Sequence, residues 1–113
     1  MEKLYVHATL KVRGTKGYER FCELMAGQRA ILEASGWRMI GAWRTAVGPV
    51  FNVIHVWEIE SANAYFEATA KMRGNPAFDA FKTMTSEVLD EEIVAMLRPT
   101  PYSPPIQPIG SAG

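Results

Sequence analysis

The stretch WRMIGAWRTAVGPVFNVIHVWE, residues 37–58, contains most of the architectural information in the chain. Two short, largely apolar runs flank Gly48-Pro49, and short apolar runs bounded by a turn are typical of β-strands. A Gly-Pro pair between two such runs indicates a turn. We therefore predict a hairpin with one strand from Arg38 to Ala46 and a second strand from Phe51 to Glu60.

A strand and a long helix precede this hairpin. The alternating apolar residues that predict the first strand are Leu4, Val6, Ala8, Leu10 and Val12. From Tyr18 the apolar spacing changes to three and four, which predicts an amphipathic helix after a turn at residues 14–17. The helix should end at Ser35-Gly36, because Gly36 can supply the left-handed residue that follows a last turn.

Two further helices and a last strand follow the hairpin. Ser61 is the expected N-cap of a helix that ends at Gly74. Asn75-Pro76 should open a third helix, since proline suits a first helical turn. The apolar stripe of this third helix is expected to contain Phe78, Phe81, Met84, Thr85 and Val88. The last strand should span Glu92 to Leu97.

This order of elements favours an α+β fold. Short connections and right-handed crossovers give a ferredoxin-like four-stranded antiparallel sheet with helices on one face, in which the first and third strands are neighbours. Bulky residues occupy both faces of the predicted strands, whereas helices can cover only one. Soluble monomers rarely expose so large an apolar patch, so we predict a homodimer in which two sheets close into one α/β barrel.

We assign residues 1–98 to this domain and residues 99–113 to a proline-rich C-terminal tail. Proline lacks a backbone donor and fixes its own φ, so the tail cannot continue a helix or an inner strand. Two interpretations remain open. The tail is either an extended terminus or an arm that lies across a partner subunit, with Tyr102, Ile106 and Ile109 as anchors.

Composition argues against several classes of function. Among 113 residues, 12 basic and 12 acidic side chains give a formal net charge of zero, and no basic face for nucleic acid is evident. No apolar run is as long as a membrane span and no signal peptide is recognisable, so we expect a cytoplasmic protein with no membrane partner. Cys22 is the single cysteine, and we interpret it as a small core residue.

The hairpin and the third helix together resemble a known family. The residues that carry a resemblance to the NIPSNAP family, within the dimeric α/β-barrel superfamily, are Gly41, Trp43, Thr45, Gly48-Pro49, Asn52, His55, Trp57, Asn75-Pro76 and Phe78. Ala46 and Ile59 depart from the pattern, which usually has an acid and an aromatic residue there. The resemblance implies the ferredoxin-like fold, a barrel dimer and a cavity in each subunit. The superfamily includes monooxygenases, isomerases, cyclases and proteins without known activity, so the resemblance selects no reaction.

Histidine supplies the best candidates for proton transfer, because the unperturbed imidazole pKa is about 6.5. Adjacency of the first and third strands could bring His7 near His55, and such a pair in a cavity could exchange protons. His55 is the better candidate, since it lies within the family pattern. Tyr65, on the second helix, is a further potential proton donor. Alternatively, both histidines are packed structural residues.

The hairpin also supplies candidate binding residues. Trp43 and Trp57, on neighbouring strands, could form an apolar wall for an aromatic ligand, with Asn52 as a hydrogen-bonding group. Arg44 could act as a handle for a ligand carboxylate. The alternatives are that the tryptophans form sheet core and that Arg44 makes a surface salt bridge.

No metal or bound cofactor is expected. Glu58 is three residues from His55 and therefore faces the other side of the strand, and the sequence has no His-x-His spacing and no Gly-rich phosphate loop. Two hypotheses follow. The first is a cofactor-independent monooxygenase, isomerase or cyclase acting on a small apolar or aromatic molecule. The second is a non-enzymatic dimer that binds a ligand or partner and uses the His and Trp residues as structural core.

Overall fold

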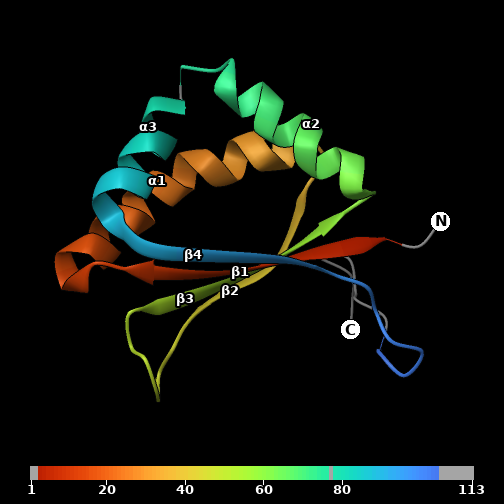
Figure 1. Ribbon diagram of the computed structural model, residues 1–113, viewed down its shortest axis with the longest axis horizontal. Helices are drawn as coiled ribbons and strands as arrows, with labels where there is room; N and C mark the ends of the chain where they lie inside the picture. The colour runs from red at the N-terminus through yellow and green to blue at the C-terminus, as the bar shows by residue number, and fades with distance from the viewer. Residues whose placement is uncertain (1–2, 77, 105–113) are drawn as a thin grey trace.

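A computed structural model describes residues 3–76 and 78–104. Four strands form one antiparallel sheet in the order β2-β3-β1-β4, with helices on one face (Figure 1). The strands are β1 (Leu4–Val12), β2 (Arg38–Arg44), β3 (Asn52–Ile59) and β4 (Leu89–Leu97). The predicted ferredoxin-like fold is confirmed, including the pairing of β1 with β3.

The helical layer consists of α1 (Gly14–Ala34), α2 (Ala62–Arg73), α3 (Phe78–Thr83) and a π-helical turn, η1 (Met84–Val88). Gly36, with a φ of 96°, follows α1 as predicted. The predicted N-cap of α2 is also confirmed, since the Ser61 hydroxyl accepts a hydrogen bond from the Ala64 backbone N–H at 3.4 Å. In the ranges that the structure describes, no helix is long and apolar enough to cross a membrane.

Several local predictions are wrong. The last strand begins at Leu89 rather than at Glu92, and Thr85, expected in an apolar stripe, is exposed. α1 begins at Gly14 rather than at Tyr18, because a single left-handed residue, Gly14 with a φ of 68°, makes the whole turn. Cys22 is exposed and is not a core residue. It follows the buried Phe21, and a step of one residue rotates a side chain by about 100° around a helix, out of the buried stripe. The predictions for the Phe78, Phe81, Ile106 and Ile109 side chains fall outside what the structure describes.

The core fills the space between the sheet and the helices in two clusters. Buried residues of the first cluster are Ala8, Leu10, Val12, Phe21, Val53, Met84, Val88 and Leu89. Buried residues of the second are Val6, Trp37, Met39, Trp57, Ile59 and Ala68. The β1 and β3 residues in both clusters alternate along their strands, so the apolar stripe of each strand points towards the helices.

A β-bulge in β2 determines which side chains share a face. Met39 pairs with Trp57, but the next pair joins Gly41 to Val56, so Ile40 is an extra residue in β2. After the bulge the alternation is reversed. Trp43 therefore lies on the open face of the sheet, which none of the helices in the described residues covers.

Candidate functional site

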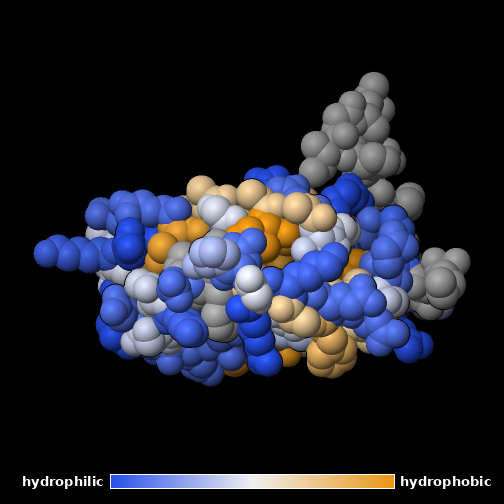
Figure 2. Space-filling model, turned by 90° about the horizontal axis from the view of Figure 1, so that it is seen from above, coloured by the Kyte–Doolittle hydropathy of each residue, from blue (hydrophilic) through white to orange (hydrophobic). Residues whose placement is uncertain are grey.

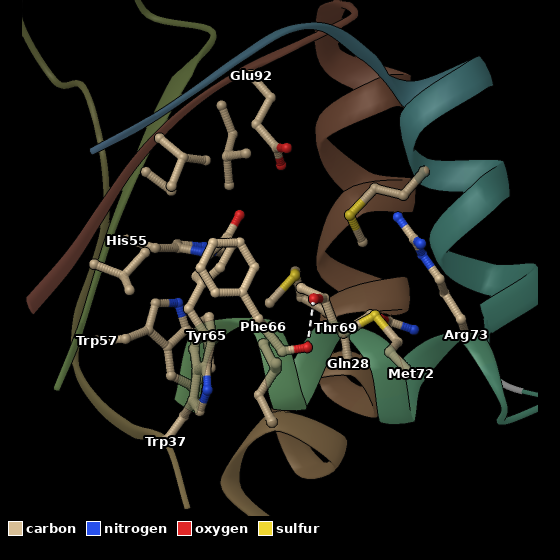
Figure 3. A pocket seen from close by; sticks show the side chains of 17 residues that line it. Gln28, Trp37, His55, Trp57, Tyr65, Phe66, Thr69, Met72, Arg73 and Glu92 are labelled. Atoms are coloured by element: carbon tan, nitrogen blue, oxygen red, sulfur yellow. Dashed lines mark hydrogen bonds between the residues drawn. The ribbon is translucent and has the colours of Figure 1, made fainter. Parts of the chain in front are cut away.

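A cavity of about 400 Å³ lies between the helix-covered face of the sheet and helices α1 and α2. Figure 2 looks down on the helical layer, where apolar side chains show near the middle of the face among hydrophilic ones. Figure 3 shows the cavity from close by. Its aromatic and polar lining residues are Gln28, Trp37, His55, Trp57, Tyr65, Phe66, Thr69, Arg73 and Glu92. A mainly apolar cavity with a few polar groups is typical of a small-molecule site.

Three aromatic rings form one wall of this cavity. The Trp37 and Trp57 ring centroids are 5.7 Å apart in an edge-to-face arrangement, and Tyr65 stacks on Trp37 at 5.6 Å. The Trp37 indole N–H donates to the Ala64 backbone carbonyl at 3.3 Å, which fixes the ring. α2 therefore holds the wall from above while β3 supplies its base, and the wall presents flat apolar surface to the cavity (Figure 3).

His55 is the buried titratable group of the cavity. It is only 5% exposed, and its ring contacts Phe21 at 5.6 Å and Trp57 at 6.3 Å between centroids. Within the described ranges its imidazole makes no hydrogen bond. Burial lowers the pKa of His55 from 6.5 to about 4, so the ring is neutral at pH 7. A neutral imidazole has one N–H donor and one nitrogen acceptor, both available to a ligand.

Two opposite charges lie at the rim of the cavity. Glu92, on β4, directs its carboxyl group into the space seen in Figure 3, and Arg73 extends from the end of α2 on the opposite side. Solvent reaches part of Glu92, yet the surrounding protein desolvates its carboxyl end and raises the pKa of that group. The two side chains make no ion pair in the part of the chain that the structure describes, and so both can contact a ligand.

The structure does not bring His7 and His55 together. His55 pairs with Ala8 of β1, whereas His7 pairs with Val56 of β3, and paired residues of an antiparallel sheet share a face. His7 therefore lies on the open face and His55 on the helix-covered face. The predicted histidine pair is wrong, because the register of β1 and β3 differs by one residue from the one that would place both rings together.

The predicted pairing of Trp43 with Trp57 in one wall is also wrong. The bulge at Ile40 turns Trp43 to the open face, where it is 54% exposed and lies against Gly41. Asn52 lies on that open face too, opposite Lys11, and does not line the cavity. Trp37 takes the place expected for Trp43.

Arg44 lies on the helix-covered side, as its alternation with Trp43 predicts, but away from the main cavity. Its guanidinium carbon is 4.5 Å from the centre of the Tyr18 ring, and its Nε donates to the Val50 carbonyl at 3.1 Å. Of the seven predicted site residues, the main cavity thus contains His55, Tyr65 and Trp57.

A charged cluster occupies the open face of β3. Glu58 as a residue is 8% exposed. Its carboxylate accepts hydrogen bonds from Arg38 Nε and Nη2 at 3.2 and 3.1 Å, from Lys3 Nζ at 3.1 Å and from Tyr5 Oη at 3.2 Å. The Arg38 hydrogen bonds, with help from Lys3, lower the pKa of Glu58. Among the described residues, no group of three or more His, Cys, Asp or Glu side chains is placed to hold a metal ion.

The cavity residues that sequence reasoning missed include Trp37, Gln28, Arg73 and Glu92. Trp37 precedes the predicted hairpin strand and Arg73 ends a helix, so neither position marks a site in a sequence. Glu92 has a usable signal, because it alternates with Val94 and Met96 on the strand face that pairs with Leu10, Ala8 and Val6. Gln28 carries a signal as well, since it is a polar residue within the apolar stripe of α1 and is 3% exposed.

The comparisons with known proteins agree with this architecture. Residues 9–104 match the model of the NIPSNAP family. A NIPSNAP family protein of Agrobacterium tumefaciens strain C58 has a TM-score of 0.77 at 25% identity, over 90% of this chain and 97% of that one. An uncharacterised NIPSNAP-like domain protein of Burkholderia xenovorans has a TM-score of 0.78 at 22% identity, over 95% and 93% of the two chains.

A more distant structure, a Rhodopseudomonas palustris protein of unknown function, has a TM-score of 0.67 at 15% identity, over 88% of this chain and 83% of that one. At that identity the likeness supports the fold alone. The comparison with curated proteins gives no match. The family match extends from β1 past β4 and includes the strands and helices that enclose the cavity. The chain belongs to the NIPSNAP family.

Proposed function

We propose that the protein binds a small apolar or aromatic molecule in the main cavity. The observation that supports this proposal is the wall formed by Trp37, Trp57 and Tyr65 beside a buried, neutral His55. A flat ring could stack on this wall, where its apolar surface leaves water, while a hydroxyl or carbonyl group hydrogen-bonds to the imidazole. Arg73 and Glu92 at the rim would contact polar groups at the outer end of the ligand.

Binding can be tested with 2-naphthol as a probe. The chain has three tryptophans, and Trp37 and Trp57 line the cavity while Trp43 lies on the open face. In NMR spectra, 2-naphthol should shift the indole N–H signals of Trp37 and Trp57 and leave that of Trp43 unchanged. Shifts confined to Trp43, or none at saturating probe, would contradict the proposal.

A pair of variants on α2 tests the location. Thr69 lines the cavity, so Thr69→Phe should fill it and weaken 2-naphthol binding at least tenfold. Ala70 is exposed on the same helix and does not line the cavity, so Ala70→Phe should bind as the parent does. Equal affinities in the two variants would place the probe elsewhere.

A proton-transfer reaction is the enzymatic form of this proposal. With a pKa of about 4, His55 is unprotonated at pH 7 and could accept a proton from an acidic C–H or O–H group of the bound molecule. Cofactor-independent oxygenation, isomerisation and cyclisation can all begin with such a step. Tyr65 would then be a hydrogen-bond donor to the substrate.

The enzymatic form can be tested with 1-tetralone in D₂O. If His55 removes the proton next to the carbonyl, the protein should speed deuterium uptake at that carbon, as followed by mass spectrometry. His55→Gln should reduce the rate to the buffer background. The same rate for parent, variant and buffer would remove the enzymatic form and leave ligand binding.

One observation favours the non-enzymatic alternative. Catalytic imidazoles are usually oriented by a hydrogen bond to a second group, and the described part of the chain supplies no such bond to His55. His7, the predicted second group, lies across the sheet. In this alternative the cavity binds its ligand without turnover.

We also propose that a second copy of the chain covers the open face of the sheet. This face exposes Trp43, Ile93 and Leu97, and β1 and β3 contribute partly buried apolar residues between them. A net charge of zero gives no overall repulsion between copies. Ile93→Lys should convert a dimer to a monomer in sedimentation equilibrium, and a monomeric parent would refute the proposal.

The proposed location is the cytoplasm.

A further inference from the structure

A second cavity, of about 290 Å³, lies between α1 and the edge strand β2. Tyr18, Cys22 and Met25 line it from α1, and Ala42 and Arg44 line it from β2. Met25 and His55 line both cavities and therefore form the partition between them. The second cavity is thus a separate space on the other side of His55, apart from the proposed ligand site.

Cationic groups dominate the charge of this second cavity. Its described lining includes two arginines, Arg29 and Arg44, and contains no Asp or Glu. Arg29 Nε is already paired with the Glu33 carboxylate at 2.8 Å. Arg44 makes no ion pair with any residue that the structure describes. The uncompensated positive charge at the cavity is therefore that of Arg44.

The contacts that hold the Arg44 guanidinium in place do not include a two-hydrogen-bond pair with a carboxylate of any described residue. The ring of Tyr18 supports it at 4.5 Å, and only its Nε donates a hydrogen bond, to the Val50 carbonyl. Its two terminal nitrogens have no hydrogen-bond partner among the described residues. A guanidinium oriented in this way is suited to a carboxylate, which it can bind with two parallel hydrogen bonds.

We infer that the second cavity is a binding site for a small apolar or aromatic carboxylate. The carboxylate pairs with Arg44 at the mouth, and the apolar body packs against Phe21, Met25 and Met39 inside. The site is distinct from the main cavity in charge as well as in place, because the main cavity presents both a carboxyl group and a guanidinium at its rim.

Cys22 provides a selective readout, because it is the single cysteine, is exposed and lines the second cavity but not the main one. The probe is 1-naphthoate, and its uncharged isostere 1-naphthamide is the ligand control. Saturating 1-naphthoate should slow the alkylation of Cys22 by iodoacetamide at least fivefold, whereas 1-naphthamide should protect much less. Arg44→Met should weaken 1-naphthoate binding about tenfold, and Arg44→Lys, which keeps a point charge, should give an intermediate affinity.

Arg20→Met is the matched control, since it removes one positive charge from the exposed side of α1 and lies outside the cavity lining. It should leave 1-naphthoate affinity unchanged. The inference is overturned if Arg20→Met and Arg44→Met weaken binding equally, because the effect is then one of net charge. It is also overturned if 1-naphthoate leaves the Cys22 rate unchanged, including the case in which it shifts Trp37 and Trp57 instead. Thr69→Phe should block the main cavity without changing the protection of Cys22 by 1-naphthoate, so this inference and the proposed function can fail separately.

Discussion

The two faces of strand β3 differ in the groups that surround a buried polar side chain. His55 and Glu58 are three residues apart and almost equally buried, at 5% and 8% exposure. On the open face, Glu58 is surrounded by hydrogen-bond donors that keep it charged and lower its pKa. On the helix-covered face, His55 is surrounded by apolar groups that keep it neutral.

The difference shows which of these two buried side chains still has polar atoms available to a ligand. Glu58 has its oxygens occupied by Arg38, Lys3 and Tyr5, so it stabilises a surface and has little left for a ligand. His55 stands between two cavities with its ring nitrogens unused by the described residues. Burial alone therefore does not identify a site, whereas burial without polar partners, next to a cavity, does.

The largest expected effect comes from the tryptophan on the helix-covered face. Trp57 is 3% exposed and contacts Trp37 and His55, so Trp57→Ala should lower the free energy of unfolding by about 3–5 kcal/mol. Trp43→Ala on the open face should cost less than about 1 kcal/mol beyond any change in self-association. Urea unfolding at several protein concentrations separates these contributions. If Trp57→Ala and Trp43→Ala lower the free energy of unfolding by similar amounts at every protein concentration, the two faces of the sheet do not differ in the predicted way.

The next effect is the pH dependence contributed by His55. Its folded-state pKa of about 4 lies below its unfolded value of 6.5, so the unfolded chain binds a proton first as the pH falls. The contribution of His55 to stability is complete above pH 6.5 and is lost as the pH falls towards 4. Between pH 7 and pH 5 the loss should be about 2 kcal/mol.

The measurement for His55 is a difference between two proteins. Urea unfolding of the parent and of His55→Gln at pH 7 and pH 5 cancels the titration of His7 and of the carboxylates, which both proteins share. The parent should lose about 2 kcal/mol more than the variant. The prediction fails if the two lose the same amount. Such a result would mean that water or a flexible helical layer keeps His55 solvated.

A smaller effect is expected on the open face. Glu58→Gln removes the charge that pairs with Arg38 and Lys3, and these cations are partly exposed, so the loss of stability should be about 1.5 kcal/mol. Glu60→Gln is a matched control, since Glu60 approaches Lys3 only to 4.0 Å and is largely exposed. Its effect should be near zero. Thermal unfolding of the two variants should therefore differ clearly, and equal midpoints would mean that solvent screens the Glu58 cluster.

Much of the fold could be predicted from the sequence because local patterns determine it. Period-two alternation identified β1, and two apolar runs around Gly48-Pro49 identified the hairpin. Ser61 and Gly36 marked helix ends through their capping chemistry. His55 and Trp57 were placed on one face because no bulge interrupts β3 between them. These predictions depend on residues close together in the chain.

The candidate site was less predictable because it depends on register. One extra residue at Ile40 moves Trp43 to the open face, and alternation alone carries no sign of a bulge. The wrong prediction that His7 lies near His55 has the same origin, since one residue of register decides which β1 side chains lie on the same sheet face as His55. The wall needs Trp37, which lies just outside β2 and whose indole N–H donates to the Ala64 carbonyl of α2, a contact between residues far apart in the chain.

The smallest expected effect tests the bulge itself. A Cβ at Gly41 would lie 2.2 Å from Cη2 of Trp43, so Gly41→Ala must displace that ring. Because Trp43 is half exposed, the ring can swing outward, and the loss of stability should be only about 0.5 kcal/mol. The indole N–H signal of Trp43 should shift in NMR spectra, while those of Trp37 and Trp57 on the other face should not. If the signals of Trp37 and Trp57 shift as well, the bulge is linked to the cavity wall, and the two faces of the sheet do not respond independently.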